Sequence, residues 1–233
     1  MNKKILIATI SHNNLEYIKN AVLEIQNFDE ADILIIDEAS DYDIINELKE
    51  FNSVKVLIHD EKSGYGTCFA SIFSYARDLN YVYLITLNIN DPKFIKDLPN
   101  IITNLDYGYD IVTCSRFLEN YDYAKIDDNV LIFFDRLANY LNDATDYNLT
   151  DPLSENKGYN IESTKDIDIT LDDYDVLLQI FIQGAYFGYN IIEIPSESNS
   201  IHVKELDLEN NPIEDFMAII ETEKYLYNRG SVN

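Results

Sequence analysis

Basic residues are scarce in this 233-residue sequence, in which 17 lysines and arginines stand against 42 aspartates and glutamates. The formal net charge of −25 at pH 7 argues against nucleic acid as a partner, because phosphates require a basic protein surface. It argues equally against binding to an anionic membrane surface. An excess of acidic residues favours solubility but does not indicate the type of fold.

Tryptophan, long apolar runs and closely spaced cysteines are also missing. No stretch approaches the ~18 consecutive apolar residues of a membrane-spanning helix, and the short amino-terminal apolar run has no small-residue cleavage site. We therefore expect no integral membrane segment and a cytoplasmic protein. The two cysteines, Cys68 and Cys114, fit no metal-binding spacing and lie among apolar residues, which predicts buried free thiols.

What the sequence does contain is an alternation of apolar runs and helical patterns, clearest up to about residue 115. This alternation indicates βαβ units and an α/β fold with a mostly parallel central sheet flanked by helices. Residues 147–159 are expected to form polar turns and residues 196–211 a polar loop. The expected strands are 3–10, 32–36, 54–58, 81–87, 111–114 and 190–194, and the expected helices are 15–25, 44–51, 69–76, 94–105, 129–141, 176–187 and 212–228.

The stretch 81–92 combines a buried strand with polar side chains that follow it. The apolar run ends in Asn88, Asn90 and Asp91, three oxygen-bearing side chains in a short space. In open α/β sheets, ligands bind beyond the carboxyl ends of the strands, so these oxygens are placed to meet a ligand or a hard metal ion. The alternative is a plain turn, because Asn, Asp and Pro are ordinary turn residues.

Six short motifs occur in order along the chain, the first four of them at the ends of predicted strands or in the turns that follow. Together they resemble the family 2 glycosyltransferases, which have the GT-A nucleotide-diphospho-sugar transferase fold, and most of all the polyprenyl-phosphate sugar transferases of the dolichyl-phosphate mannose synthase type. The likeness runs from about residue 3 to residue 195. The motifs are Ala8-Thr9-Ile10-Ser11-His12-Asn13-Asn14, Ile36-Asp37-Glu38-Ala39-Ser40-Asp41, Lys62-Ser63-Gly64-Tyr65-Gly66-Thr67, Cys114-Ser115-Arg116, Thr150-Asp151-Pro152-Leu153-Ser154 and Gly188-Tyr189-Asn190-Ile191-Ile192-Glu193-Ile194-Pro195.

The resemblance implies a division of roles within one domain, 1–233. It assigns 1–117 to a nucleotide-binding half, 118–195 to an acceptor half, and 196–233 to the polar loop and a terminal helix. Asp151 matches the family's candidate catalytic base, which lies near the acceptor. The positions implied to bind the nucleotide or donor are Thr9, Ser11, Asp37, Gly64, Gly66, Asn88 and Arg116.

Each implied role has a structural alternative. Asp37 could cap the next helix instead of binding a nucleotide, and Gly64 and Gly66 could serve a plain turn. Asp151 could open a turn before a proline. Arg116 could form a surface ion pair, since carboxylates are abundant in this acidic chain.

The metal motif of the family departs from its pattern here. The family's Asp-x-Asp holds Mg²⁺ or Mn²⁺, which neutralises the diphosphate leaving group. Asn88 and Asn90 stand at those two positions, and Asp91 supplies a carboxylate one residue further on. Because asparagine is neutral, we expect Mg²⁺ or Mn²⁺ binding at Asn90 and Asp91 to be weak or absent.

Two functions follow from these motifs. The first is an inverting glycosyltransferase that moves a sugar from a nucleotide-diphosphate sugar to a polyprenyl phosphate, a glycan or a protein. The second is a catalytically inactive domain of the same fold that acts as a nucleotide-binding or assembly module. A nucleotidyltransferase is disfavoured because no Gly-x-Gly-x-x-x-Arg signature follows the first predicted strand.

Overall fold

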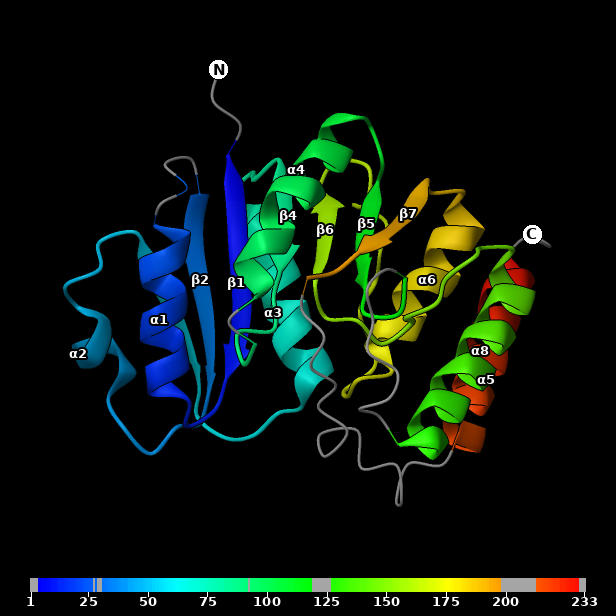
Figure 1. The fold of residues 1–233 in the computed structure, drawn as a ribbon, viewed down its shortest axis with the longest axis horizontal. Coiled ribbons are helices and arrows are strands. Elements are labelled where there is room, and N and C mark those ends of the chain that lie inside the picture. Colours follow the sequence, from blue (N-terminus) through cyan, green and yellow to red (C-terminus); the bar gives the residue numbers. More distant parts are fainter. Residues whose placement is uncertain are drawn as a thin grey trace.

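A computed structural model describes residues 4–26, 28, 31–91, 93–118, 127–197 and 213–230, without the side chains of Phe94 and residues 228–230. Strands and helices alternate through the first half of the chain (Figure 1). The strands are β1 (Ile5–Ser11), β2 (Ala31–Glu38), β3 (Val54–His59), β4 (Tyr83–Thr86), β5 (Ile111–Ser115), β6 (Lys157–Asn160) and β7 (Ile191–Pro195). The helices are α1 (Leu15–Ile25), α2 (Ile44–Leu48), α3 (Tyr65–Asp78), the 3-10 helix η1 (Phe94–Asp97), α4 (Leu98–Asp106), α5 (Asp128–Thr145), α6 (Val176–Phe187) and α8 (Ile213–Gly230).

All seven strands belong to one sheet, in the order β3-β2-β1-β4-β6-β5-β7. Every neighbouring pair is parallel except those of β6, which runs antiparallel to both β4 and β5. The carboxyl ends of β1 to β5 therefore lie at one edge of the sheet, where β6 begins. The predicted fold class is confirmed: a mixed α/β structure has a mostly parallel central sheet flanked by helices.

Two hydrophobic cores lie on opposite faces of the sheet. On β1, for example, Leu6 and Ala8 face one core, while Ile5 and Ile7 face the other, as the two-residue period of a strand requires. Helices α1, α2 and α4 pack on the second face, whereas α3, α5, α6 and α8 belong to the first core. Both faces of β1 and β2 are covered, which explains their continuous apolar sequences.

Strand β6 is the element that the sequence pattern did not predict. It begins within the stretch 147–159, which was expected to form polar turns, and Lys157 and Gly158 are unusual in a buried strand. The structure accommodates both: the Lys157 ammonium donates to the carbonyl of Ser154 and lies 5.1 Å from the ring centroid of Phe181. Gly158 leaves room for Ile101, whose Cγ2 would lie 2.3 Å from an added Cβ.

Other sequence predictions on secondary structure agree closely with the described elements. The helix predicted over 176–187 is α6, and the strands of the first half differ by one or two residues at their ends. Most of the predicted loop over 196–211 lies outside the described residues. Cys68 and Cys114 are buried free thiols, as expected. Among the helices that the structure describes, none has both the length and the apolar character needed to cross a lipid bilayer.

Helix α6 begins beside a destabilising carboxylate. Burial first, and then the nearby Asp173 and Asp215, raise the pKa of Asp175 to about 6, well above the ~4 of a free aspartate. A raised folded-state pKa contributes stability that is complete below about pH 4 and lost as the pH rises through about 6. At neutral pH the folded protein therefore carries an unfavourable charge at this position.

We expect Asp175→Asn to stabilise the protein at pH 7.5 by ~1 kcal/mol, after allowing for solvent screening of a partly exposed group. The melting temperature should rise by about 2–4 °C at pH 7.5 and should be unchanged near pH 4. Asp143→Asn, an exposed change of the same charge on α5, is the control and should have little effect. An equal gain at both pH values would show that the charge is not the cause.

Candidate functional site

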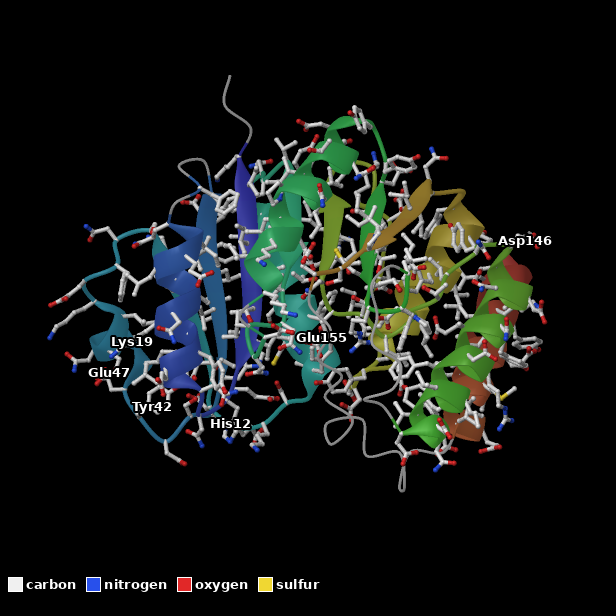
Figure 2. All side chains as sticks on the ribbon, viewed as in Figure 1. His12, Lys19, Tyr42, Glu47, Asp146 and Glu155 are labelled. Carbon is white, nitrogen blue, oxygen red and sulfur yellow. The ribbon has the colours of Figure 1, made fainter. Side chains whose placement is uncertain are left out.

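A cavity of about 440 Å³ opens at the carboxyl ends of β1, β2 and β4. We call it the first cavity. His12 and Glu155, which both line it, lie toward the same edge of the sheet in Figure 2. Its lining residues are Ala8, Thr9, Ile10, Ser11, His12, Asn14, Glu38, Lys62, Gly64, Tyr65, Phe69, Ile72, Thr86, Leu87, Asn88, Asn90, Glu155, Asp173 and Tyr174. This is the position at which open α/β sheets bind ligands.

The first cavity has an aromatic wall. Tyr65, at the start of α3, stacks on Tyr174 with 4.4 Å between the ring centroids and 15° between the ring planes. Phe69 stacks in turn on Tyr65 at 5.5 Å. Burial, and then the nearby Glu155 carboxylate, raises the pKa of Tyr65, so its hydroxyl stays protonated at neutral pH. Aromatic side chains that line a cavity can pack against a planar ring by stacking or by edge-to-face contact.

Ser11 lines the first cavity and has a buried hydroxyl group. It ends β1, is 3% exposed, and its Oγ is buried without a hydrogen-bond partner among the described residues. A buried hydroxyl without a partner is costly, and most such groups in proteins are satisfied. A ligand atom that bonds to Ser11 Oγ would remove this cost. Thr9 also lines the cavity, two residues earlier on the same strand.

The glycine turn before α3 packs against backbone from a distant part of the chain. Gly64 has φ +91°, a conformation that favours glycine, and a Cβ there would lie 2.3 Å from the carbonyl oxygen of Asp172. A Cβ on Gly66 would lie 1.9 Å from the carbonyl oxygen of Leu171. The Gly66 N–H donates to the Asp172 carbonyl at 2.8 Å. In this structure the close approach that the glycines permit is therefore to residues 171–172, although Gly64 also lines the cavity.

Two glutamine side chains on α6 bind the backbone of the residues that precede 171–172. Gln183 accepts from the Asp168 N–H at 2.8 Å and donates to the Asp168 carbonyl at 2.6 Å. Gln179 accepts from the Thr170 N–H at 3.0 Å and donates to the Thr170 hydroxyl at 2.8 Å. We call residues 168–174 the wall segment, because it is fixed to α6 at one end and supplies Asp173 and Tyr174 to the cavity at the other.

Asp37 and Glu38, at the end of β2, have different surroundings. Asp37 is 2% exposed and accepts from the Oγ of Ser40 at 2.5 Å and from its N–H at 3.3 Å, which stabilises the turn after β2. It is not among the described residues that line the first cavity, and Asp43 rather than Asp37 caps α2. Glu38 does line the cavity and accepts from the N–H of Gly64 at 2.8 Å. Nucleotide binding by Asp37 stays a prediction.

The side chains at the metal-motif positions use their oxygens within the fold. Asn88 Oδ1 accepts from the Asn90 N–H at 2.9 Å, and Asn90 Oδ1 accepts from the Asn14 Nδ2 at 3.2 Å. Asp91 Oδ1 accepts from the Lys93 N–H at 2.8 Å. Across the described ranges, no group of three or more His, Cys, Asp or Glu side chains could hold a metal ion. These residues do not fit a Mg²⁺ or Mn²⁺ site, and the expected weak or absent binding stays a prediction.

Asp151, the predicted base, is fully buried in an ion pair with Arg116. Arg116 Nε and Nη2 donate to the two carboxylate oxygens of Asp151 at 2.6 and 2.7 Å, and the Arg116 N–H adds a bond at 3.1 Å. The Asp151 side chain is 0% exposed and that of Arg116 is 13% exposed. The pair therefore joins the end of β5 to the loop before β6 by a bidentate bond of the strongest kind.

Three further groups complete this buried polar network. Glu193 on β7 accepts from the Thr150 hydroxyl at 2.7 Å and from the Asp151 N–H at 2.9 Å. Lys157 lies close by: burial lowers its pKa to about 8, while the Asp151 charge acts in the opposite direction. Two acids and two bases thus lie together at the carboxyl end of β5.

A second cavity of about 320 Å³ lies beside this network. Phe117 and Phe134 form its apolar side, with ring centroids 5.1 Å apart. Its polar lining residues are three asparagines, Thr150 and one carboxylate, Asp135. Its lining residues are Phe117, Leu131, Phe134, Asp135, Ala138, Asn139, Asn142, Asn148, Leu149 and Thr150.

The structure divides the predicted site residues into two groups. Those that line the first cavity are Thr9, Ser11, Gly64, Asn88 and Asn90, whereas Asp37, Gly66, Asp91, Arg116 and Asp151 are not among its lining residues. The sequence pattern missed Glu38, Tyr65, Glu155, Asp173 and Tyr174. Glu38 and Tyr65 lie inside the quoted motifs and could have been considered, but the wall segment carries no local signal of a site.

Neither a protein-family model nor a curated protein matches this chain. Solved structures do match it. A glucosyl-3-phosphoglycerate synthase from Mycobacterium tuberculosis, solved with phosphoglyceric acid, has a TM-score of 0.65 and 13% identity over 94% of this chain and 80% of its own. A protein from Desulfovibrio desulfuricans assigned as a nucleotide-diphospho-sugar transferase has a TM-score of 0.52 and 10% identity over 97% of this chain and 98% of its own.

A third similar structure belongs to a different activity. The 4-diphosphocytidyl-2C-methyl-D-erythritol synthase from Anaerococcus prevotii has a TM-score of 0.54 and 12% identity, over 95% of this chain and 99% of its own. At these identities the likeness establishes the fold alone, and one fold can host several activities. The function must be argued from the site.

Proposed function

We propose that this protein binds a nucleotide-diphosphate sugar in the first cavity and transfers the sugar to an acceptor by inverting displacement. The observation that carries the proposal is Ser11, which lines a cavity beside the stacked rings of Tyr65 and Tyr174 and whose buried hydroxyl has no partner among the described residues. A nucleoside offers both a planar base for the rings and polar edges for the hydroxyl. The similar folds of a glucosyl-3-phosphoglycerate synthase and of a protein assigned as a nucleotide-diphospho-sugar transferase support the assignment by analogy.

The remaining roles follow from position. Thr9 and Ser11 border the nucleoside, Gly64 lets the turn approach it, and Asn88 faces the diphosphate. Asp37 acts on the nucleotide through the turn that it holds after β2. The acceptor, whether polyprenyl phosphate, glycan or protein, enters from the second cavity, whose wall includes Thr150, next to Asp151.

The alternative is a catalytically inactive nucleotide-binding or assembly module, and one observation favours it. A general base must reach the acceptor hydroxyl and carry a usable pair of electrons. Both carboxylate oxygens of Asp151 are instead bonded to Arg116, and the Asp151 side chain is 0% exposed. Arg116 is likewise engaged by Asp151, which limits its use for phosphate binding.

A thermal-shift panel of nucleosides, nucleoside diphosphates and nucleotide-diphosphate sugars tests the binding. A ligand at 100 times its Kd should stabilise the native state by ~2.7 kcal/mol. We expect Ser11→Ala to weaken binding of the best ligand by about 2- to 13-fold, the loss of one neutral hydrogen bond of ~0.5–1.5 kcal/mol. Ser74→Ala, at an exposed position on α3, is the control and should bind normally.

The outcomes separate the possibilities. If no member of the panel stabilises the protein, the first cavity is not a nucleotide site. If a ligand binds but Ser11→Ala binds it equally well, Ser11 is not part of the site. Release of nucleoside diphosphate from a bound nucleotide sugar supports the transferase, and binding without release supports the inactive module.

A further inference from the structure

The orientation of the Asn88 side-chain amide is fixed by a hydrogen bond to the backbone. Its Oδ1 accepts a hydrogen bond from the backbone N–H of Asn90 at 2.9 Å. A backbone N–H can only donate, so the oxygen must point to it and the NH₂ group must point elsewhere. Asn88 lines the first cavity, and its NH₂ group has no partner within the described part of the chain.

The Asn90 side chain is oriented by another side-chain amide rather than by a backbone N–H. Its Oδ1 accepts from Asn14 Nδ2 at 3.2 Å, and in this arrangement its own NH₂ group is left for the first cavity. Two amide donors therefore stand at the carboxyl end of β4, where the related motif has two carboxylates. An amide NH₂ group donates hydrogen bonds to acceptor oxygens. The same NH₂ group cannot coordinate a cation.

We propose that Asn88 and Asn90 bind the phosphate oxygens of the ligand directly, through their amide N–H groups, without a divalent cation. The inference rests on the proposed function, since it concerns the diphosphate of a nucleotide ligand in the first cavity. The amides take over the contact that a bridging metal ion makes in a carboxylate site. Hydrogen bonds to a charged acceptor are stronger than those between neutral groups, which favours this use of the two amides.

The other charges around the first cavity make neutral side chains important at these positions. Glu38, Glu155 and Asp173 line it, whereas Lys62 is the one lysine or arginine among its described lining residues. One oxygen of Glu38 is satisfied by the N–H groups of Ser63 and Gly64 at 3.0 and 2.8 Å. His12 Nδ1 is bonded to the Glu38 carbonyl at 2.7 Å. Two more carboxylates would repel a diphosphate unless a cation lay between them.

Calorimetry of the wild type tests the inference. The probes are the nucleoside diphosphate that stabilises the protein most and its parent nucleoside, each in EDTA and in Mn²⁺. We expect the diphosphate to bind more tightly than the nucleoside in EDTA, and Mn²⁺ to change its Kd by less than about twofold. Binding of the diphosphate that appears only with Mn²⁺ would overturn the inference.

The variant Asn88→Asp with Asn90→Asp provides the matching change. A carboxylate oxygen can accept the same bonds from Asn90 N–H and Asn14 Nδ2, so the turn should keep its shape. We expect diphosphate binding in EDTA to weaken about tenfold or more and to recover in Mn²⁺, because charge repulsion is exchanged for coordination. Asn52→Asp with Asn100→Asp adds the same two charges at exposed positions that line neither cavity and should bind as the wild type does.

Failure of the inference and failure of the proposed function differ in this experiment. If nucleoside and diphosphate bind equally in EDTA, nucleotide binding in the first cavity is supported but the proposed role of the two amides is wrong. An unchanged EDTA affinity in the double aspartate variant has the same meaning. If neither ligand binds under any condition, the proposed function and the inference both fall.

Discussion

Asp151→Asn is expected to destabilise the protein by ~3–5 kcal/mol, the usual cost of removing one partner from a buried ion pair. The asparagine keeps the shape of the side chain but removes the charge that compensates Arg116 and Lys157. The largely buried guanidinium of Arg116 then loses its charged partner, which weakens the bidentate contact. Lys157 also loses a nearby negative charge, and burial already lowers its pKa to about 8. For a chain of this size, the melting temperature should fall by roughly 10 °C.

Urea denaturation of the wild type and Asp151→Asn measures this effect, with Asp143→Asn on the surface of α5 as the control. Arg116→Met and the double variant complete a mutant cycle, and the coupling between the two positions should be large because they are in direct contact. A normal urea midpoint in Asp151→Asn, together with lost sugar transfer, would contradict the structural role. It would support the catalytic role predicted from the sequence.

Gly64→Ala is expected to cost ~3–5 kcal/mol and to abolish ligand binding, since overpacking and a strained backbone act together. The new Cβ would lie 2.3 Å from the Asp172 carbonyl oxygen, which is backbone and cannot rotate away. The wall segment must then move, and Tyr174 with it, so the stack on Tyr65 should open. Loss of the aromatic wall removes the surface that we assign to the nucleoside base.

Gly108→Ala is a matched control, because Gly108 has φ +96° and nothing lies within 4 Å of its added Cβ. It carries only the backbone penalty of ~1 kcal/mol, so the difference between the two variants isolates the contact with Asp172. Chemical denaturation gives the stability difference, and the thermal shift with the best ligand gives the binding. If both variants lost the same stability, the contact between the added Cβ and Asp172 would have no energetic cost, and the wall segment would be able to move away freely.

The sequence predicted those parts of the fold whose signals are local. The continuous apolar runs of β1 and β2 indicated a sheet covered on both faces, and the long, mostly apolar sequence of α6 indicated a buried helix. Strand β6 was missed because its stability comes from long-range contacts, namely a lysine ammonium on the Ser154 carbonyl and the side chain of Ile101 over Gly158. Neither contact leaves a trace in a single sequence.

The candidate site was predictable only in part for the same reason. Strand ends indicated Thr9, Ser11 and Asn88, and these residues do line the first cavity, because the carboxyl ends of parallel strands meet at one edge of the sheet. A motif match could not reveal that Asp151 is closed off by Arg116, since burial depends on how the whole loop folds. Tyr174 lies more than 100 residues from Tyr65 in the chain, and only the packing of the wall segment brings their rings together.

The antiparallel strand β6 also bears on the order in which this chain can fold as it is synthesised. When β4 has left the ribosome, its edge has unpaired backbone groups, because its partner Lys157–Asn160 has not yet been made. An exposed strand edge is a template for wrong pairing with other chains, and nascent domains are vulnerable while they are incomplete. A truncated protein ending near residue 117 would keep that edge open permanently. Because β6 pairs with both β4 and β5, we expect translation through β6 to be the step that protects this edge of the sheet.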